Sequence, residues 1–283
     1  ITMARIAGES PRTARHVRIS PGTVADPVVL CCEIAGGGPP VMLIHGLGDS
    51  IWVWRNLIPT LSPRSRVLAL ELRGHGRSSS PHESFTAADM ASDIHRLSEE
   101  LSAKRPLLIA QGFGARLALL LAVEKPEFPS ALVLIGANTG PPNAAAISAM
   151  KNHVLAGEMS AAYKAKRDII PPPRGMSPQE RAEHHRLFMR NNPAGLAAAL
   201  AAAEEAPNLI ERFGDIECPT LAVAGEFDEP RIKALEGMAA NMHNCTAAII
   251  EGSGHYPQLD SPEAFETVLL DFLENLGLIG PRQ

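Results

Sequence analysis

The sequence lacks several features that would assign it to a class at once. It has no excess of positive charge, because 26 lysine and arginine residues stand against 31 aspartate and glutamate residues, for a formal net charge of −5. Nucleic acid is therefore not expected as a partner, since phosphate binding requires a concentrated positive surface. No apolar run approaches the roughly 18–20 residues that cross a bilayer, so no membrane partner is expected either.

Cysteine and metal-binding motifs are also sparse. The four cysteines, Cys31, Cys32, Cys218 and Cys245, lie in apolar, strand-like segments without a Cys-x-x-Cys spacing. Buried free thiols are their expected state, and neither a zinc motif nor a His-Glu-x-x-His helix is present. The first residues contain arginines but no apolar segment with a cleavage site, so no signal peptide is expected and the cytoplasm is the expected compartment.

What the chain does contain is a regular alternation of short apolar segments and helical patterns. Strands are expected over 16–19, 28–34, 41–44, 67–71, 107–110, 131–136, 221–225 and 247–250. Helices are expected between them, over 51–61, 86–101 and 113–123, and at the end of the chain over 262–276. This alternation predicts an α/β fold with a mostly parallel, eight-stranded sheet covered on both faces.

One segment interrupts this alternation. From residue 138 to 213 there is no strand pattern, and the alanine-rich sequence predicts several helices, over 144–155, 159–167, 178–190 and 194–205. We therefore expect a core domain of residues 1–137 and 214–283, with a helical cap of residues 138–213 inserted after the sixth strand. His184 and His185 lie in the cap segment without a third metal ligand and are interpreted as solvated helix residues.

The stretch around residue 112 carries the most specific local pattern. A buried strand runs into Ala110-Gln111-Gly112-Phe113-Gly114, and an apolar helix follows. This is the layout of a nucleophile elbow, in which a sharp strand-to-helix turn lifts one side chain above the sheet. Gly112 stands at the position of the nucleophile, and a glycine has no side chain with which to attack.

Four further motifs occur between the expected strands. They are His45-Gly46-Leu47-Gly48, Glu71-Leu72-Arg73-Gly74-His75-Gly76-Arg77-Ser78, Gly225-Glu226-Phe227-Asp228 and Gly252-Ser253-Gly254-His255-Tyr256-Pro257. With the elbow and these motifs in this order, nearly the whole chain resembles the α/β-hydrolase fold family with a helical cap. The second motif departs from the family pattern, because Glu71 occupies a position where aspartate is usual.

The resemblance implies a role for each candidate site residue. His255 would act as the general base and Asp228 would orient its imidazole, while the backbone N–H groups of Leu47 and Phe113 would form an oxyanion hole.

Three other residues are candidates for contact with the substrate. They are His45, interpreted as structural rather than catalytic, Gly46, and Trp52, which could border the pocket. His75 and Ser78 are interpreted as parts of the turn that carries them.

By the same resemblance, the expected activity is hydrolysis of a carboxylic ester, thioester or lactone, without a metal or organic cofactor. No arginine cluster that would hold an anion can be placed in the apolar cap, so a small to medium, largely apolar substrate is expected. The expected partner is this small molecule, and a homodimer is a candidate assembly.

Gly112 leaves three interpretations open. The chain is a serine hydrolase whose nucleophile has been replaced, which makes it a silenced form. Alternatively, the glycine is native and the chain is a pseudo-hydrolase that binds a small ligand under its cap. In the third interpretation the glycine is native and the His255–Asp228 pair performs other chemistry, such as proton abstraction, lyase or cyclase work, or hydrolysis by a directly activated water.

Overall fold

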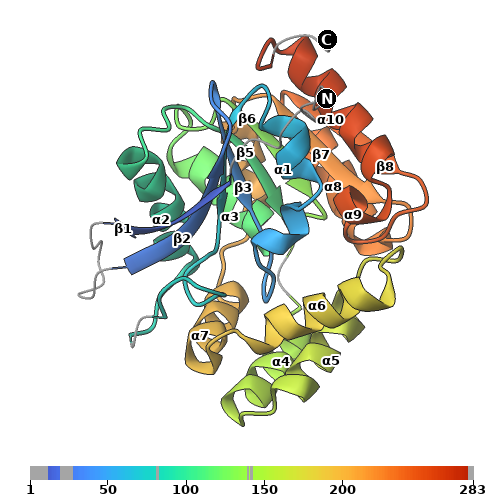
Figure 1. Cartoon of the computed structure of the whole chain (residues 1–283). Coiled ribbons are helices and arrows are strands. Elements are labelled where there is room, and N and C mark those ends of the chain that lie inside the picture. The colour runs from blue at the N-terminus through green and yellow to red at the C-terminus, as the bar shows by residue number, and fades with distance from the viewer. Residues whose placement is uncertain (1–11, 20–27, 81–82, 139, 141–142, 280–283) are drawn as a thin grey trace, which may run out of the picture.

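The computed structural model describes residues 12–19, 28–80, 83–138, 140 and 143–279. Within these residues, eight strands form one sheet in the spatial order β1-β2-β4-β3-β5-β6-β7-β8, with helices around it (Figure 1). The first eleven residues, to which the expectation of no signal peptide refers, lie outside the described part. The strands are β1 (Thr13–Ile19), β2 (Val28–Ala35), β3 (Pro40–Ile44), β4 (Arg66–Leu70), β5 (Leu107–Gln111), β6 (Ala131–Ile135), β7 (Thr220–Gly225) and β8 (Cys245–Ile250).

The sheet is mixed, and its parallel part positions the candidate site. Strands β1, β2 and β4 pair antiparallel, whereas β4, β3, β5, β6, β7 and β8 run parallel to one another. The carboxyl ends of these parallel strands share one edge of the sheet, as the pairing of Ile44 with Ala110 and of Gln111 with Ile135 illustrates. The loops that follow β3, β5, β6, β7 and β8 therefore converge, which is where open α/β sheets bind their ligands.

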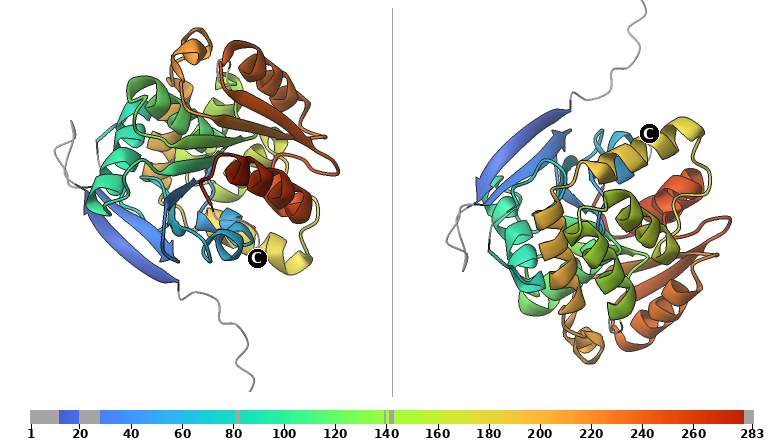
Figure 2. Two further views of the ribbon diagram at one scale, coloured as in Figure 1. Left: turned by 90° about the horizontal axis from the view of Figure 1, so that it is seen from above. Right: turned by 90° about the horizontal axis from the view of Figure 1, so that it is seen from below.

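Helices cover both faces of the sheet, as Figure 2 shows in two views. One face packs against α2 (Ala87–Glu100), α3 (Phe113–Glu124) and α8 (Glu229–Asn241). The other face packs against α1 (Leu57–Leu61), α9 (Pro257–Asp260) and α10 (Pro262–Asn275). The alternation of side chains along β5 supplies both cores, since Leu108 and Ala110 contact the first layer while Leu107 and Ile109 contact the second.

The helical insertion after β6 is confirmed. It contains α4 (Ala144–Leu155), α5 (Met159–Ile169), α6 (Pro178–Met189) and α7 (Pro193–Glu204), which lie together beyond one edge of the sheet (Figure 1). These helices share an apolar core of their own, which includes Met150, Tyr163, Phe188 and Leu200. Among the described residues, no helix is both long and apolar enough to cross a membrane.

The predicted fold class is therefore confirmed, whereas two local predictions were incomplete. The helix expected over residues 51–61 is split into a 3₁₀ turn, η1 (Ile51–Trp54), and α1. A helix that the sequence pattern did not predict, α8, buries only Ala234, Leu235 and Met238. A helix with so narrow an apolar stripe gives a weak periodic pattern. A second 3₁₀ turn, η2 (Ile210–Asp215), leads from the cap into β7.

A buried ion pair fixes the turn after β4 to the helical layer. The Arg73 guanidinium donates two hydrogen bonds to the carboxylate of Asp93 on α2, and both side chains are almost fully buried. Removal of one partner from such a pair leaves an uncompensated charge in a low-dielectric environment.

We expect Arg73→Met to lower the free energy of unfolding by about 3–5 kcal/mol, because the Asp93 carboxylate loses its counter-ion. Urea denaturation at neutral pH measures the change. As a control, Arg212→Met removes an arginine from the exposed Arg212–Asp215 pair and should cost much less. Similar losses in the two variants would show that the buried pair does not stabilise the fold.

Candidate active site

The turn between β5 and α3 has the backbone geometry of a nucleophile elbow. Gly112 has φ 57° and ψ −117°, a conformation that is strained for residues with a side chain. Its N–H donates to the carbonyl of Ile135 on the neighbouring strand at 2.9 Å, so the turn is held to the sheet edge. The α-helix begins at the next residue, Phe113.

His255 and Asp228 meet beside this turn. Asp228 follows β7 and His255 follows β8, and the imidazole Nδ1 lies 2.6 Å from Asp228 Oδ2. This hydrogen bond leaves Nε2 as the basic nitrogen, and Nε2 is buried without a hydrogen-bond partner in the described residues. A Cβ atom placed on Gly112 would lie 3.4 Å from Nε2. A side-chain hydroxyl at position 112 would therefore lie within reach of the base.

The loop after β3 lies against the same turn. The Gly46 Cα atom is 3.8 Å from the position of that Cβ atom, and Leu47 follows it directly. Within the described residues, the N–H groups of Leu47 and Phe113 have no hydrogen-bond acceptor. Phe113 is also the first residue of a helix of 12 residues, where the helix dipole favours negative charge. The two predicted oxyanion donors are thus available beside Gly112.

A cavity of about 580 Å³ lies between the core and the cap. Gly46, Leu47, Gly112, Phe113 and His255 line it at the sheet edge. Its apolar wall comes mainly from the cap, with Ile147, Met150, Ile169, Leu200 and Ala203. It also has charged lining residues that the sequence analysis did not place there, namely Asp49, Arg116, Lys166, Asp168 and Arg231. The cavity is therefore only partly apolar.

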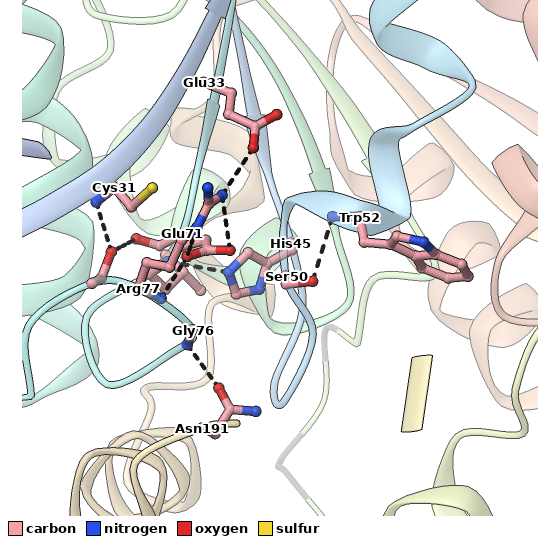
Figure 3. Close-up of polar contacts among 11 residues, drawn as sticks. Cys31, Glu33, His45, Ser50, Trp52, Glu71, Gly76, Arg77 and Asn191 are labelled. Carbon is pink, nitrogen blue, oxygen red and sulfur yellow. Dashed lines mark hydrogen bonds and ion pairs between the residues drawn. The ribbon is translucent and has the colours of Figure 1, made fainter. Parts of the chain in front are cut away.

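His45 does not line this cavity, contrary to the predicted substrate contact. Its ring is fully buried, and Nδ1 donates to the Gly46 carbonyl at 2.8 Å. Nε2 accepts from the Leu72 N–H at 3.1 Å, the bond drawn to the His45 ring in Figure 3. His75 lies beside it and accepts a hydrogen bond from the Gly48 N–H at 3.0 Å. Both histidines hydrogen-bond to the backbone of the loop after β3, and His45 is buried outside the cavity.

The turn that carries His75 is held by its own polar contacts. The Glu71 carboxylate accepts hydrogen bonds from the Arg77 backbone N–H and side chain, and Arg77 also reaches Glu33 (Figure 3). Ser78 Oγ donates to the Glu71 carbonyl at 2.6 Å, as expected for a turn residue. Glu71, at the position where the resemblance expects aspartate, thus holds this turn through Arg77.

Trp52 also lies outside the cavity. Its indole ring points away from His45 (Figure 3), and the Arg55 guanidinium stacks over it at 3.7 Å from the ring centroid. It lines a separate surface hollow of about 380 Å³, together with Arg55 and Glu183. The sequence could not distinguish the two sides of η1, because only the position of the cap decides which side borders the cavity.

A buried polar network joins the cap to the loop after β3. Asp49, in that loop, pairs with Lys166 of α5 and accepts hydrogen bonds from His184 Nε2 at 3.3 Å and from the Tyr256 hydroxyl at 3.1 Å. Burial alone would raise the pKa of Asp49, but Lys166 and His184 outweigh it and hold the pKa below its usual range. His184 also accepts a hydrogen bond from the Tyr163 hydroxyl at 2.9 Å.

This network corrects the interpretation of His184. His184 is buried and bonded at both ring nitrogens, whereas its neighbour His185 is exposed as expected. Adjacent positions on a helix point in different directions, so one can reach the core while the next faces solvent.

Among the described residues that line the cavity, there is no serine, threonine, cysteine or tyrosine that could replace a nucleophile at position 112. Ser253 is buried and donates to the Ile250 carbonyl at 2.7 Å. All four cysteines are free thiols, and Cys31, Cys32 and Cys218 are buried as expected while Cys245 is half-buried. Burial raises the pKa of Cys31 and Cys218 to about 11.

Within the described residues, no group of three or more histidine, cysteine, aspartate or glutamate side chains is arranged to hold a metal ion.

Comparison with known proteins agrees with this fold. A profile of the Alpha/beta hydrolase family matches residues 41–268, and the chain belongs to this family. A Bacillus subtilis protein with the assigned name 2-succinyl-6-hydroxy-2,4-cyclohexadiene-1-carboxylate synthase is 26% identical, and the alignment covers 86% of this chain and 94% of that protein. The 2-(acetamidomethylene)succinate hydrolase of Mesorhizobium japonicum is 25% identical, with 84% and 89% covered.

Solved structures share the fold over nearly the whole chain. A thermophilic esterase from Thermogutta terrifontis, solved with malate bound, superposes with a TM-score of 0.83 at 23% identity, covering 93% of this chain and 99% of that one. Other similarities are more local, since the chain spans only 31% of the length of an uncharacterised Mycobacterium tuberculosis protein that it matches over 105 residues.

The two histidines behind the loop after β3 should make stability depend on pH. Burial lowers the pKa of His45 to about 4 and that of His75 to about 3, below the value of about 6.5 in an unfolded chain. The unfolded state therefore binds more protons at mildly acidic pH. We expect the free energy of unfolding to fall as pH drops from about 6.5 toward 4, by up to about 1.4 kcal/mol per pH unit for each histidine.

Urea denaturation between pH 7 and pH 4.5 measures this slope, because the lower limit lies about two pH units below the pKa of an unfolded histidine. His75→Gln should reduce it by the share of one histidine, while His185→Gln, on the exposed side of α6, should leave it unchanged. An unchanged slope in His75→Gln would contradict the assignment of His75 as a neutral, buried acceptor.

The position of the His255 imidazole should depend on the absence of a side chain at Gly136. A Cβ atom there would lie 2.9 Å from His255 Cε1, and Gly136 has φ 56°. Gly157 has φ 77° and open space around it, so Gly157→Ala has the backbone strain without the contact. We expect Gly136→Ala to cost about 1–3 kcal/mol more stability than Gly157→Ala in urea denaturation. Equal losses would indicate that the imidazole moves aside freely.

Proposed function

We propose that this chain has the active site of a hydrolase for a small to medium carboxylic ester, thioester or lactone, in which Gly112 removes the covalent route. The observation that carries the proposal is the free Nε2 of His255, oriented by Asp228 and 3.4 Å from the position of a Cβ atom on Gly112. The names of a full-length relative, a hydrolase, and of a structural neighbour, an esterase, support the same class.

The site would use different first steps with and without a hydroxyl at position 112. In the chain as it stands, His255 Nε2 would take a proton from a water molecule whose oxygen attacks the ester carbonyl carbon. The Leu47 and Phe113 N–H groups would stabilise the oxyanion, and the protonated imidazole would return its proton to the departing alkoxide. A triad that lacks one member retains roughly 10³–10⁴-fold acceleration over water, so the chain as it stands would be a silenced form with slow turnover.

The cavity supports a substrate of limited size. Its volume of about 580 Å³ is in the range of small-molecule sites, and its apolar wall from the cap would pack against the acyl or alcohol part.

We expect Gly112→Ser to create hydrolysis of p-nitrophenyl esters that is at least about 10²-fold faster than in the unaltered chain, since a serine Oγ would lie beside His255 Nε2. The same change should lower stability by about 1–3 kcal/mol, because serine at φ 57° is strained. Labelling by a serine-directed phosphonate, followed by mass spectrometry, tests whether position 112 becomes the nucleophile.

Two matched variants isolate the hydroxyl. Gly112→Ala adds the same Cβ and the same strain without Oγ, so it should lose stability and gain no activity. Gly112→Ser combined with His255→Gln should keep the hydroxyl but lose the base and the labelling. If Gly112→Ser is folded yet neither labelled nor active on esters, the ester-hydrolase proposal is wrong.

A second function is favoured by the same unpartnered nitrogen. Because no Oγ stands between His255 Nε2 and the cavity, the base could take a proton directly from a carbon acid whose enolate the two N–H groups stabilise. The name of another full-length relative, a synthase, supports chemistry other than hydrolysis on such a chain. Exchange of α-hydrogens of small thioesters in deuterium oxide, absent in His255→Gln, would support this function. Ligand binding without hydrolysis or hydrogen exchange would instead support the interpretation of the chain as a pseudo-hydrolase.

A further inference from the structure

Two arginines in the cavity lack a carboxylate partner in the described part of the chain. Arg116 is buried to 95%, and its guanidinium donates only to backbone carbonyls, those of Gly140 at 2.8 Å, Ala206 at 3.2 Å and Pro207 at 2.5 Å. Its Nε atom is buried without a partner. Burial lowers the pKa of Arg116, and no carboxylate of the described residues forms an ion pair with it that would offset the cost of burying its charge.

Arg231 is the second of these cations. It is half-buried on the first turn of α8, three residues after Asp228, and its Nε is also buried without a partner. It forms no ion pair with a described residue, and it lines the cavity. Its guanidinium is thus available to a ligand beside the catalytic pair.

The topology places the two arginines on the same side of the cavity. Arg116 lies on α3, which follows β5, and Arg231 lies on α8, which follows β7, with β6 between these strands. Both helices pack on the same face of the sheet. Their first turns therefore flank the loop after β6, whose Gly136 and Asn138 also line the cavity.

The other charges in the cavity do not neutralise these two. Lys166 is already paired with Asp49, so that cation and that carboxylate offset each other. Asp168 is exposed to solvent and contacts neither arginine as an ion pair. A buried or half-buried cation without a counter-ion is costly, and a ligand that supplies the anion recovers that cost.

We propose that the cavity contains an anion subsite on the Arg116–Arg231 side, and that the substrate carries a carboxylate there in addition to its reacting carbonyl. An arginine fork matches the two oxygens of a carboxylate. The substrate is thus a half-ester or half-thioester of a small dicarboxylic acid, or a lactone that bears a carboxylate. Its uncharged part packs on the apolar wall of the cap. This inference rests on the proposed function only for the position of the reacting carbonyl next to Gly112.

Binding to the unaltered chain tests the subsite without turnover. Isothermal titration calorimetry compares monomethyl glutarate with dimethyl glutarate, which share a carbon skeleton and differ in one carboxylate. The monoester should bind at least about tenfold more tightly, because a charge-assisted hydrogen bond contributes that much. Arg231→Gln should remove most of this preference.

Lys233→Gln is the matched control. It removes one positive charge from the same helix, but Lys233 is largely exposed and pairs with Glu229, so the preference for the monoester should persist. Arg116→Gln should weaken binding too, although it also releases the carbonyls of Gly140 and Ala206, so Arg231 carries the test. Equal binding of both esters, no detectable binding of the monoester, or equal losses in Arg231→Gln and Lys233→Gln would overturn the subsite.

Hydrolysis by Gly112→Ser separates this inference from the proposed function. Hydrolysis of neutral p-nitrophenyl esters with no preference for the p-nitrophenyl half-ester of glutarate overturns the subsite and leaves the proposed function. Binding of monomethyl glutarate that depends on Arg231, with no hydrolysis of any ester by Gly112→Ser, supports the subsite and overturns the ester hydrolase.

Discussion

The left-handed turn at Gly112 is the constraint on which the rest of the site depends. It ends β5 at the carboxyl edge of the sheet and starts α3 at the next residue. Phe113 therefore lines the cavity at a helix N-terminus, and a Cβ atom at position 112 would lie 3.4 Å from His255 Nε2. Glycine adopts this turn without strain, whereas a serine would add a nucleophilic hydroxyl but would strain the backbone. The chain thus has the family fold with glycine at this turn, and the loss of a nucleophile there stays part of the proposal.

The cap and the core are joined by polar contacts that also border the reacting position. Lys166 of α5 pairs with Asp49, two residues after Leu47, and Tyr256, next to His255, donates to the same carboxylate. Arg116 bonds to carbonyls on both sides of the cap segment, at Gly140 and Pro207. The same contacts therefore fix the cap against the loop after β3 and set which charges line the cavity.

Sequence patterns were sufficient for the fold and for placing Asp228 and His255 after neighbouring strands. The alternation of apolar strands and helices predicted the eight-stranded sheet and the insertion after β6, because strand burial leaves a continuous apolar run and helix burial a periodic one. The order of the elbow, Asp228 and His255 was also visible, because each residue ends or follows a recognisable strand. The structure places these residues together, and their roles in a reaction stay a proposal.

The sequence by itself determined which groups a reaction can use. It contains a histidine, an aspartate and two backbone donors at the expected positions, and it has no side chain at position 112. Only the tertiary structure decided the character of the cavity. His45 and Trp52 lie outside it and His184 is buried, while Arg116 and Arg231, far apart in the chain, line it together. The physical reason is that the direction of a side chain and the presence of a counter-ion depend on contacts between distant segments, which local patterns do not encode.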